Sequence, residues 1–417
     1  MQIVIVSDFG DVNGGAAKVA ITSARGLVEA GIAVTYVCAL APVSPLLDHP
    51  GITVHCLNFE SVWTRRNPLA AAAQGIWHRP ARQAMDDILG TLPQDETIVH
   101  FHQWTKAFSP SVLGAPARWG LPSVISMHDY FLVCPNGAYY RYADAKPCQV
   151  APMSASCIAS QCDRRGYMHK TVRLLRHSAT ERATARAGSS LSVLNVSPFA
   201  ESVVDKFLPK RHARFIVGSP VDVERATPVA VAKNADFLFV GRLTEEKGVR
   251  LLAEVARDAK LPLTIAGDGP LLNCLRQMGG TIRCTGWLDE AGLAALMGQA
   301  RALIFPSTWY ETGGLVVLEA LARGLPVIVS RNTAAADFVE DGVNGYLVDP
   351  GDVHALRSCL LKLADDETVA RLGLEAHRRY WADPQTIAAH TDRLLAVYQT
   401  VLAGHRARID SPAAGHA

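Results

Sequence analysis

The stretch LFVGRLTEEKG, residues 238–248, combines a short apolar run with two cations and two glycines. The apolar run is typical of a buried strand and ends at Gly241; Arg242 and Lys247 follow, and Gly248 opens a helical segment. In a parallel sheet the loop after a strand lies at the carboxyl edge, where ligands bind. We therefore expect Arg242 and Lys247 to face a diphosphate. The alternative interpretation is a solvated basic loop.

A second stretch, ETGGLVVLE at residues 311–319, carries another glycine pair. Gly313 and Gly314 let the backbone approach a ligand closely, and the helix after them directs unpaired N–H groups toward an anion. Glu311 precedes this helix and Glu319 lies about two turns inside it, so the carboxylates can accept hydrogen bonds from sugar hydroxyls and from a ribose diol. The alternative is an ordinary helix whose acids favour its dipole and form an ion pair.

Short β-branched runs alternate with helical segments along the chain, which predicts parallel strands joined by crossover helices. The expected strands are 3–6, 34–38, 53–55, 97–101, 123–126, 191–194 and 214–217, and then, after a Pro/Ala-rich linker, 237–240, 263–266, 281–285, 302–305 and 326–329. We expect an α/β fold of two Rossmann-like, doubly wound domains that face each other across a cleft. The expected parts are 1–220, 221–385, a C-terminal helix at 386–403 that packs back on the first domain, and a disordered end at 410–417.

In this order and spacing, the two stretches resemble glycosyltransferase family 4, the group 1 glycosyltransferases, over nearly the whole chain. Three more segments match the second domain of that family: LTIAGDGP at 263–270, GWL at 286–288 and DGVNGYLV at 341–348. The resemblance implies a GT-B fold, with the acceptor on the first domain and the nucleotide sugar on the second. It also implies retention of the anomeric configuration, without a metal or other cofactor in catalysis.

The resemblance assigns roles to residues of the second domain. It implies that Arg242 and Lys247 contact the donor diphosphate, that Glu311 contacts the transferred sugar and that Glu319 holds the nucleoside ribose. It places the base near the backbone of Trp287 and Leu288. The remaining implied donor contacts are Gly241, Thr312, Gly313, Gly314 and Leu315.

The loop after the first expected strand carries the pair Gly14 and Gly15. Together with Gly10, this pair does not have the spacing G-x-G-x-x-G, which argues against an NAD-dependent oxidoreductase. The resemblance implies that the pair lies beside the donor phosphate and the acceptor. It also implies a donor contact at Ser219, in the segment between the domains.

His128 follows an expected strand, which places it at the ligand-binding edge of the sheet. The resemblance implies a catalytic position, close to the transferring sugar; the alternative is a structural histidine. His102 is a weaker candidate for an acceptor contact, and we expect His100 to be buried.

Four cysteines, Cys134, Cys148, Cys157 and Cys162, fall within an insertion of the first domain at residues 130–166. Four thiols in a weakly hydrophobic loop are suitable ligands for a structural zinc ion, which would order the segment. Their spacing fits no compact zinc motif, so free thiols are the alternative.

Lys+Arg total 41 and Asp+Glu 39, a formal charge of +2 that argues against nucleic acid as a partner. No apolar run is long enough to cross a bilayer, and the N-terminus lacks the features of a secretory signal, so we expect a cytoplasmic protein. Residues 62–82 mix tryptophans, arginines and alanines. We consider a helix on the inner face of an anionic membrane, or a solvated helix packed on the domain.

The predicted function is therefore the transfer of a hexose-type sugar from a nucleotide-diphosphate donor to a saccharide or lipid-linked acceptor in bacterial envelope or exopolysaccharide synthesis. The alternatives are a GT-B epimerase or phosphorylase and a sugar-nucleotide-binding protein without turnover. The paired glutamates 311 and 319 argue against the first, and the set Arg242, Lys247, Glu311 and His128 argues against the second.

Overall fold

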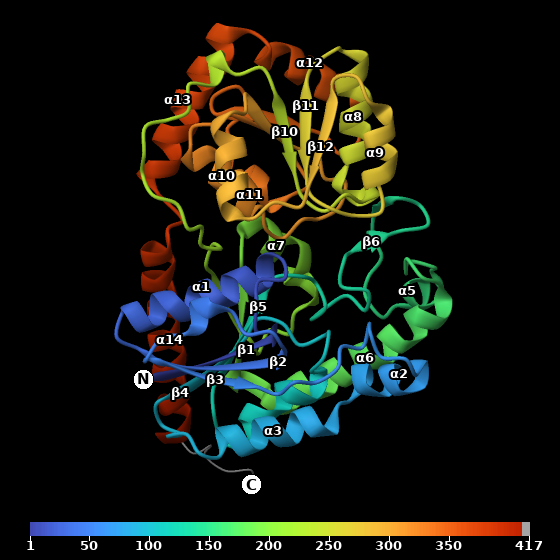
Figure 1. The fold of residues 1–417 in the computed structure, drawn as a ribbon. Coiled ribbons are helices and arrows are strands. Elements are labelled where there is room, and N and C mark those ends of the chain that lie inside the picture. Colours follow the sequence, from blue (N-terminus) through green and yellow to red (C-terminus); the bar gives the residue numbers. More distant parts are fainter. Residues whose placement is uncertain (411–417) are drawn as a thin grey trace. The chain divides into compact units, whose positions relative to one another are not determined.

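The computed structural model describes residues 1–410, and its chain forms two compact units (Figure 1). The first unit comprises residues 1–139, 149–220 and the chain from 387 onward; the second comprises 140–148 and 221–386. The short segment 140–148 thus groups with the second unit, whereas the sequence placed the whole insertion in the first domain. Apart from Asp410, which ends the last helix, the expected disorder of 410–417 lies outside the described residues.

The first unit is built on a seven-stranded sheet with the strand order β3-β2-β1-β4-β5-β8-β9. All neighbouring strands in it are parallel. The inner strand β1 pairs on both sides, so that Ile3 lies opposite Val34 and Ile98. The strands are β1 (Gln2–Phe9), β2 (Ala33–Leu40), β3 (Ile52–Cys56), β4 (Thr97–Phe101), β5 (Ser123–Met127), β8 (Leu191–Asn195) and β9 (Ala213–Ile216).

Helices cover this sheet, with α1 on one face and α3 and α6 on the other (Figure 1). The C-terminal helix α14 packs against α1, and this approach needs a glycine: a Cβ at Gly26 would lie 2.1 Å from Thr391 Oγ1. The helices are α1 (Gly15–Glu29), α2 (Pro68–Ile76), α3 (Arg79–Leu89), α4 (Ala115–Arg118), α5 (Ala155–Ala159), α6 (Tyr167–Ala187), α7 (Pro198–Val204) and α14 (Ile387–Asp410).

The second unit contains a six-stranded, wholly parallel sheet with the order β12-β11-β10-β13-β14-β15. Its strands are β10 (Phe237–Val240), β11 (Leu263–Ala266), β12 (Ile282–Gly286), β13 (Ala302–Phe305), β14 (Val327–Ser330) and β15 (Gly345–Val348). Its helices are α8 (Val249–Asp258), α9 (Leu272–Met278), α10 (Glu290–Gly298), α11 (Leu315–Ala322), α12 (Val353–Leu363) and α13 (Asp366–Ala382). The predicted α/β class with two doubly wound sheets is confirmed.

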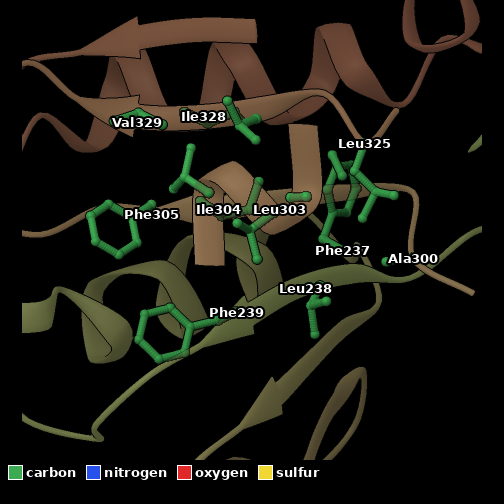
Figure 2. Close-up of a cluster of buried hydrophobic side chains, with 14 of the residues drawn as sticks. Phe237, Leu238, Phe239, Ala300, Leu303, Ile304, Phe305, Leu325, Ile328 and Val329 are labelled. Carbon is green, nitrogen blue, oxygen red and sulfur yellow. The ribbon is translucent and has the colours of Figure 1, made fainter. Parts of the chain in front are cut away.

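The core of the second unit explains why its strands read as continuous apolar runs. Figure 2 shows Phe237 and Phe239 of β10 packed with Leu303 and Ile304 of β13. Such strands are covered by helices on both faces, so successive side chains are buried on either side rather than alternating with polar ones. Burial of these side chains is the dominant favourable term in folding the unit.

The segment 62–82, interpreted above as one helix, forms two. Helix α2 ends at Ile76, Trp77 has extended backbone angles, and α3 begins at Arg79 before Pro80. The tryptophan at the start of this segment, Trp63, lies beneath the guanidinium of Arg165, whose carbon is 4.1 Å from its ring centroid. None of the helices described between residues 1 and 410 is both long and apolar enough to cross a bilayer.

Candidate functional site

In the second unit the strand order reverses between β10 and β13, the point at which open α/β sheets bind ligands. The loops that leave these two strands touch each other there. The N–H of Thr308 donates to the carbonyl of Glu246 at 2.9 Å. Gly248 has φ +69°, and a Cβ on it would lie 2.1 Å from the Pro306 carbonyl oxygen. The glycine that opens α8 is therefore required by this close approach of the two loops.

Lys247 and Glu311 meet at this switch point. Lys247 Nζ forms an ion pair with Glu311 Oε2, and the side chains are only 16% and 15% exposed. The same carboxylate oxygen accepts a hydrogen bond from Trp309 Nε1 at 2.7 Å and one from Ser307 Oγ at 3.5 Å. Within residues 1–410, all three hydrogen-bond partners of this carboxylate bind Oε2, so Oε1 has no partner there and can accept a hydrogen bond from a ligand.

Arg242 differs from Lys247 because its side chain is exposed and makes no ion pair or hydrogen bond with the described part of the chain. Lys247, in contrast, also lies 5.1 Å from the ring centroid of Trp309 and 5.8 Å from that of Phe305. The two cations are therefore on one loop, one packed near two aromatic rings and the other exposed to solvent. The sequence missed Trp309, although an aromatic residue two positions before Glu311 is a recognisable signal.

The glycine pair precedes α11, and its two members have different surroundings. A Cβ at Gly313 would meet no atom within 4 Å, whereas one at Gly314 would lie 2.8 Å from the Cβ of Ala335. Gly314 is thus needed for packing, and Gly313 leaves open space above the helix start. Helix α11 begins at Leu315, which places Glu319 just over one turn inside it rather than two, with 9% of its surface exposed. Thr312 is buried as well.

The loops after β10, β11 and β12 approach one another closely at glycines, which explains why the segment LTIAGDGP has a glycine at position 267. A Cβ at Gly267 would lie 1.9 Å from the carbonyl oxygen of Gly241, and the N–H of Gly267 donates to the carbonyl of Gly286 at 2.8 Å. The chain then turns outward, so that Trp287 is 75% exposed while Leu288 is half-buried. The indole of Trp287 is therefore available to solvent or to a ligand.

In the first unit, three histidines lie on or directly after the neighbouring strands β4 and β5: His100 within β4, His102 just after it and His128 just after β5. His102 Nδ1 and His128 Nε2 are 2.9 Å apart, and the two rings stack with centroids 5.1 Å apart. His100 is buried, as expected, and its ring nitrogens bond Tyr398 Oη at 2.6 Å and Ser126 Oγ at 2.8 Å. His102, which the sequence offered only as a weaker candidate for an acceptor contact, is therefore a direct neighbour of His128.

Burial keeps these imidazoles neutral. It lowers the pKa of His100 and of His128 to about 3, and that of His102 well below its ordinary value. A neutral imidazole has one donor and one acceptor nitrogen, so the bond between His102 and His128 couples their tautomers. Nε2 of His102 is buried without a hydrogen-bond partner among the described atoms.

The remaining predicted residues of the first unit lie in or near loops at the carboxyl edge. Gly14 has φ +94° and caps α1, which starts at Gly15. Ser219 is buried, and the neighbouring Gly218 carbonyl is bonded by Nδ1 of His390 at 2.8 Å. His390 comes from α14 and no sequence signal identified it, because only the fold brings that helix here.

The zinc hypothesis for Cys134, Cys148, Cys157 and Cys162 is not supported by the geometry. Within residues 1–410, no three Cys, His, Asp or Glu side chains converge as metal ligands. All four cysteines are free thiols, and burial raises the pKa of Cys134 to about 12, which disfavours the thiolate that zinc requires.

Hydrogen bonds hold this insertion instead. Asn136 Nδ2 donates to the Cys162 carbonyl at 3.1 Å, and the buried Lys170 donates to the carbonyls of Cys157 and Ser160. An ion pair of 2.6 Å joins Arg173 to Asp163. The ammonium of Lys170 thus satisfies loop carbonyls, and the guanidinium of Arg173 pairs with a loop carboxylate. These bonds order the insertion without a metal ion.

Residues 234–366 match the family model "Glycosyl transferases group 1". Glycogen synthase of Mycobacterium tuberculosis is 30% identical over 314 residues, which cover 70% of this chain and 72% of that protein. Phosphatidyl-myo-inositol mannosyltransferase of Mycobacterium leprae is 34% identical over 177 residues, covering 39% of this chain and 46% of that one.

Among solved structures, HepE of Anabaena in complex with UDP has a TM-score of 0.65 at 15% identity, with 96% of this chain and all of that chain covered. This likeness shows the fold and agrees with the two doubly wound sheets. The extent and identity of the match to the mycobacterial synthase show the family. The chain therefore belongs to the group 1 glycosyltransferases and is a nucleotide-sugar-dependent glycosyltransferase with the GT-B fold.

Proposed function

We propose that this glycosyltransferase moves a hexose-type sugar from a nucleotide-diphosphate donor to a hydroxyl of a saccharide or lipid-linked acceptor, with retention of the anomeric configuration. The observation that carries the proposal is the cluster of Lys247, Glu311 and Trp309 at the switch point of the second sheet, with Arg242 on the same loop. This cluster offers positive charge for a diphosphate and an oriented carboxylate for sugar hydroxyls.

In this proposal the second unit stabilises the leaving group. As the glycosidic bond breaks, negative charge grows on the nucleoside diphosphate, and preorganised cations lower the energy of that state. Lys247 and Arg242 supply this charge, and the open approach at Gly313 lets the N–H groups at the start of α11 add to it. Glu311 Oε1 accepts a hydrogen bond from the transferred sugar, and Glu319 is proposed to hold the ribose.

His128 is proposed to contact the transferring sugar from the first unit. Its low pKa keeps the ring neutral at physiological pH, so it acts as a hydrogen-bond partner rather than as a cation. We assign no covalent nucleophile. Gly14, Gly15 and Ser219 are proposed to lie along the donor, and the backbone at Trp287 and Leu288 is proposed to bind the base.

The acceptor and pathway are proposed from the character of the similar proteins. One is named a glycogen synthase, another a phosphatidylinositol mannosyltransferase and a third a lipopolysaccharide core glycosyltransferase of Rhizobium meliloti. We therefore propose a role in bacterial envelope or exopolysaccharide synthesis. The proposal includes a cytoplasmic reaction, at the inner face of the membrane if the acceptor is lipid-linked.

The test is nucleotide release from a panel of UDP-, GDP- and ADP-sugars, comparing the wild type with Arg242→Ala and Glu311→Ala. We expect one donor to be hydrolysed slowly without acceptor, and both variants to lose that turnover. The anomer released, read by proton NMR before mutarotation, should match the donor's. If no donor turns over, even with membrane lipids added, the assignment fails and a binding role without turnover replaces it.

A further inference from the structure

A hairpin from the insertion in the first half of the chain lies on the loop that carries Glu311. Strand β6 (Tyr140–Arg141) pairs antiparallel with β7 (Lys146–Pro147). The segment 140–148 groups with the second unit, although the chain before and after it belongs to the first. The donor site described above does not include this hairpin.

The hairpin is too short to be ordered by its own bonds. Even a longer two-stranded hairpin is only marginally stable in water when it is isolated. Within the turn, an ion pair of 2.6 Å joins Arg141 to Asp144, and the rings of Tyr140 and Tyr142 meet edge to face with centroids 5.2 Å apart. Tyr140 is only 2% exposed. The order of the hairpin therefore depends on the surface on which this ring packs.

The first residue of the hairpin contacts the loop that follows β13. Tyr140 Oη lies 3.4 Å from Thr308 Oγ1. The Thr308 hydroxyl donates its single proton to the Glu246 carbonyl at 3.3 Å, so it accepts from the hydroxyl of Tyr140. Both distances are long for bonds between two oxygens, so the packing of the tyrosine ring, more than its hydroxyl, holds Thr308 in place.

The last residue of the hairpin approaches the same loop. Burial raises the pKa of the Tyr310 hydroxyl, and the nearby thiol of Cys148 raises it further. Both side chains are partly buried. The two ends of the hairpin therefore approach Thr308 and Tyr310, the residues on either side of Trp309.

This loop orients the carboxylate of Glu311. Trp309 Nε1 and Ser307 Oγ donate to Glu311 Oε2 at 2.7 and 3.5 Å. Thr308 lies between these two donors in the chain, so a shift of the loop at Thr308 would move both of them and the carboxylate that they hold. Misplacing a group that positions the substrate by about 1 Å can cost roughly a hundredfold in rate.

We propose that the hairpin 140–148 supports the donor site and that Tyr140 is a positioning residue for Glu311. The hairpin fixes the loop 307–311 so that the carboxylate faces the transferred sugar. Tyr140 does not touch the ligand; it acts through Thr308 and its neighbours. The inference rests on the proposed function, and it adds to the donor site a residue that the sequence placed in the other domain.

The experiment is calorimetric titration of Tyr140→Ala with UDP-glucose, ADP-glucose and GDP-mannose, each compared with its free nucleoside diphosphate. For the donor that the wild type binds, we expect affinity at least about tenfold weaker for the sugar nucleotide and within about twofold for the nucleoside diphosphate, because only the sugar contact depends on Glu311. Tyr140→Phe keeps the ring and loses one long hydrogen bond, so both affinities should stay within about threefold of the wild type. Equal weakening of both ligands by Tyr140→Ala, or of neither, would overturn the proposal.

Two further variants separate positioning from folding. Tyr346→Ala removes another buried tyrosine ring of the second unit, outside the loop 307–311, and should lower the melting temperature without changing the ratio of the two affinities. A changed ratio in this control would show that the effect is not specific to Tyr140 and would refute the proposal. The double variant Tyr140→Ala/Glu311→Gln should bind the sugar nucleotide within about twofold of Glu311→Gln alone, because two residues that act through one contact are not additive. Fully additive losses would mean that Tyr140 acts independently of Glu311, against the proposal.

Binding and turnover by the wild type separate the two claims. If one sugar nucleotide binds and is turned over, but Tyr140→Ala affects both ligands alike, the positioning role fails and the proposed function stands. If Tyr140→Ala shows the expected loss and the wild type turns over none of the donors, the hairpin supports a sugar-nucleotide site in a protein whose proposed function is wrong. If the wild type binds none of the three, both claims fail.

Discussion

Replacing Lys247 with methionine tests the donor site, because it removes one charge and keeps most of the side-chain volume. In the structure this ammonium group pairs with Glu311, and both side chains are about 15% exposed. The loss should leave Glu311 with the indole donor of Trp309 at 2.7 Å and the Ser307 hydroxyl. The carboxylate is therefore not left without donors, and we expect a stability loss of only about 1–2 kcal/mol.

The expected effect on turnover is larger. Removing one preorganised donor to a developing negative charge typically costs about 3 kcal/mol, which corresponds to roughly a hundredfold in kcat. The matched control is Arg250→Met. Arg250 forms an ion pair with Glu245 at 2.7 Å on the same segment, but the side chains are 42% and 57% exposed. Such a pair contributes about 0–1 kcal/mol, so this variant should keep activity within roughly twofold.

The assay combines nucleotide release at saturating donor with thermal unfolding for both variants. The reasoning predicts a separation: Lys247→Met folds and loses turnover, whereas Arg250→Met folds and retains it. If Lys247→Met keeps activity within threefold of the wild type, the lysine does not face the donor diphosphate. If both variants lose activity equally, the loop as a whole matters and the specific role of Lys247 is refuted.

Three further outcomes are expected. Gly313→Ala should leave the melting temperature unchanged and cut donor turnover at least tenfold. Gly314→Ala should instead cost about 1–3 kcal/mol of stability, because only its added Cβ meets a neighbour, at 2.8 Å. Calorimetry together with the turnover assay checks both variants. Arg301→Met should cost about 3 kcal/mol in urea unfolding, since the buried guanidinium donates to three backbone carbonyls, and a loss below 1 kcal/mol would contradict this. Stability should fall as the pH drops below about 6.5, since burial lowers the pKa of His100 to about 3 and of His390 to about 4, so the unfolded chain binds more protons. Each buried histidine lowers the free energy of unfolding by up to about 1.4 kcal/mol per pH unit of acidification. Two buried carboxyls with raised pKa values, Asp8 and Asp129, partly offset this loss. Thermal unfolding that is insensitive to pH from 7 to 5 would argue against the neutral histidine cluster.

Most strands could be predicted because a parallel sheet leaves long apolar runs in the sequence. The expected run 237–240, for example, is β10 without any change of boundary. The last strand, β15, was missed because its four residues start with Gly345 and directly follow a turn-forming segment, so the apolar signal is short. The antiparallel pair β6 (Tyr140–Arg141) and β7 (Lys146–Pro147) was missed because two residues per strand carry no periodicity.

The sequence indicated individual residues of the candidate site, but it did not show which of their side chains contact one another. Lys247 and Glu311 each follow a strand, which is visible in the sequence, but their contact depends on β10 and β13 being neighbours in the sheet. Strand order is a property of the packed fold and leaves no local signal. The same holds for His390, which from the last helix bonds Ser23 of α1 and the Gly218 carbonyl. Counting thiols suggested zinc for the same reason: composition does not show which side chains converge.

The central claim is that the Lys247–Glu311 cluster binds the sugar nucleotide, with Glu311 contacting the transferred sugar rather than the nucleotide. Calorimetric titration of Glu311→Gln with the preferred sugar nucleotide and with the corresponding nucleoside diphosphate tests this most directly. We predict wild-type affinity for the nucleoside diphosphate and at least tenfold weaker affinity for the sugar nucleotide. Equal weakening for both ligands, or none for either, would contradict the assignment of Glu311 to the sugar.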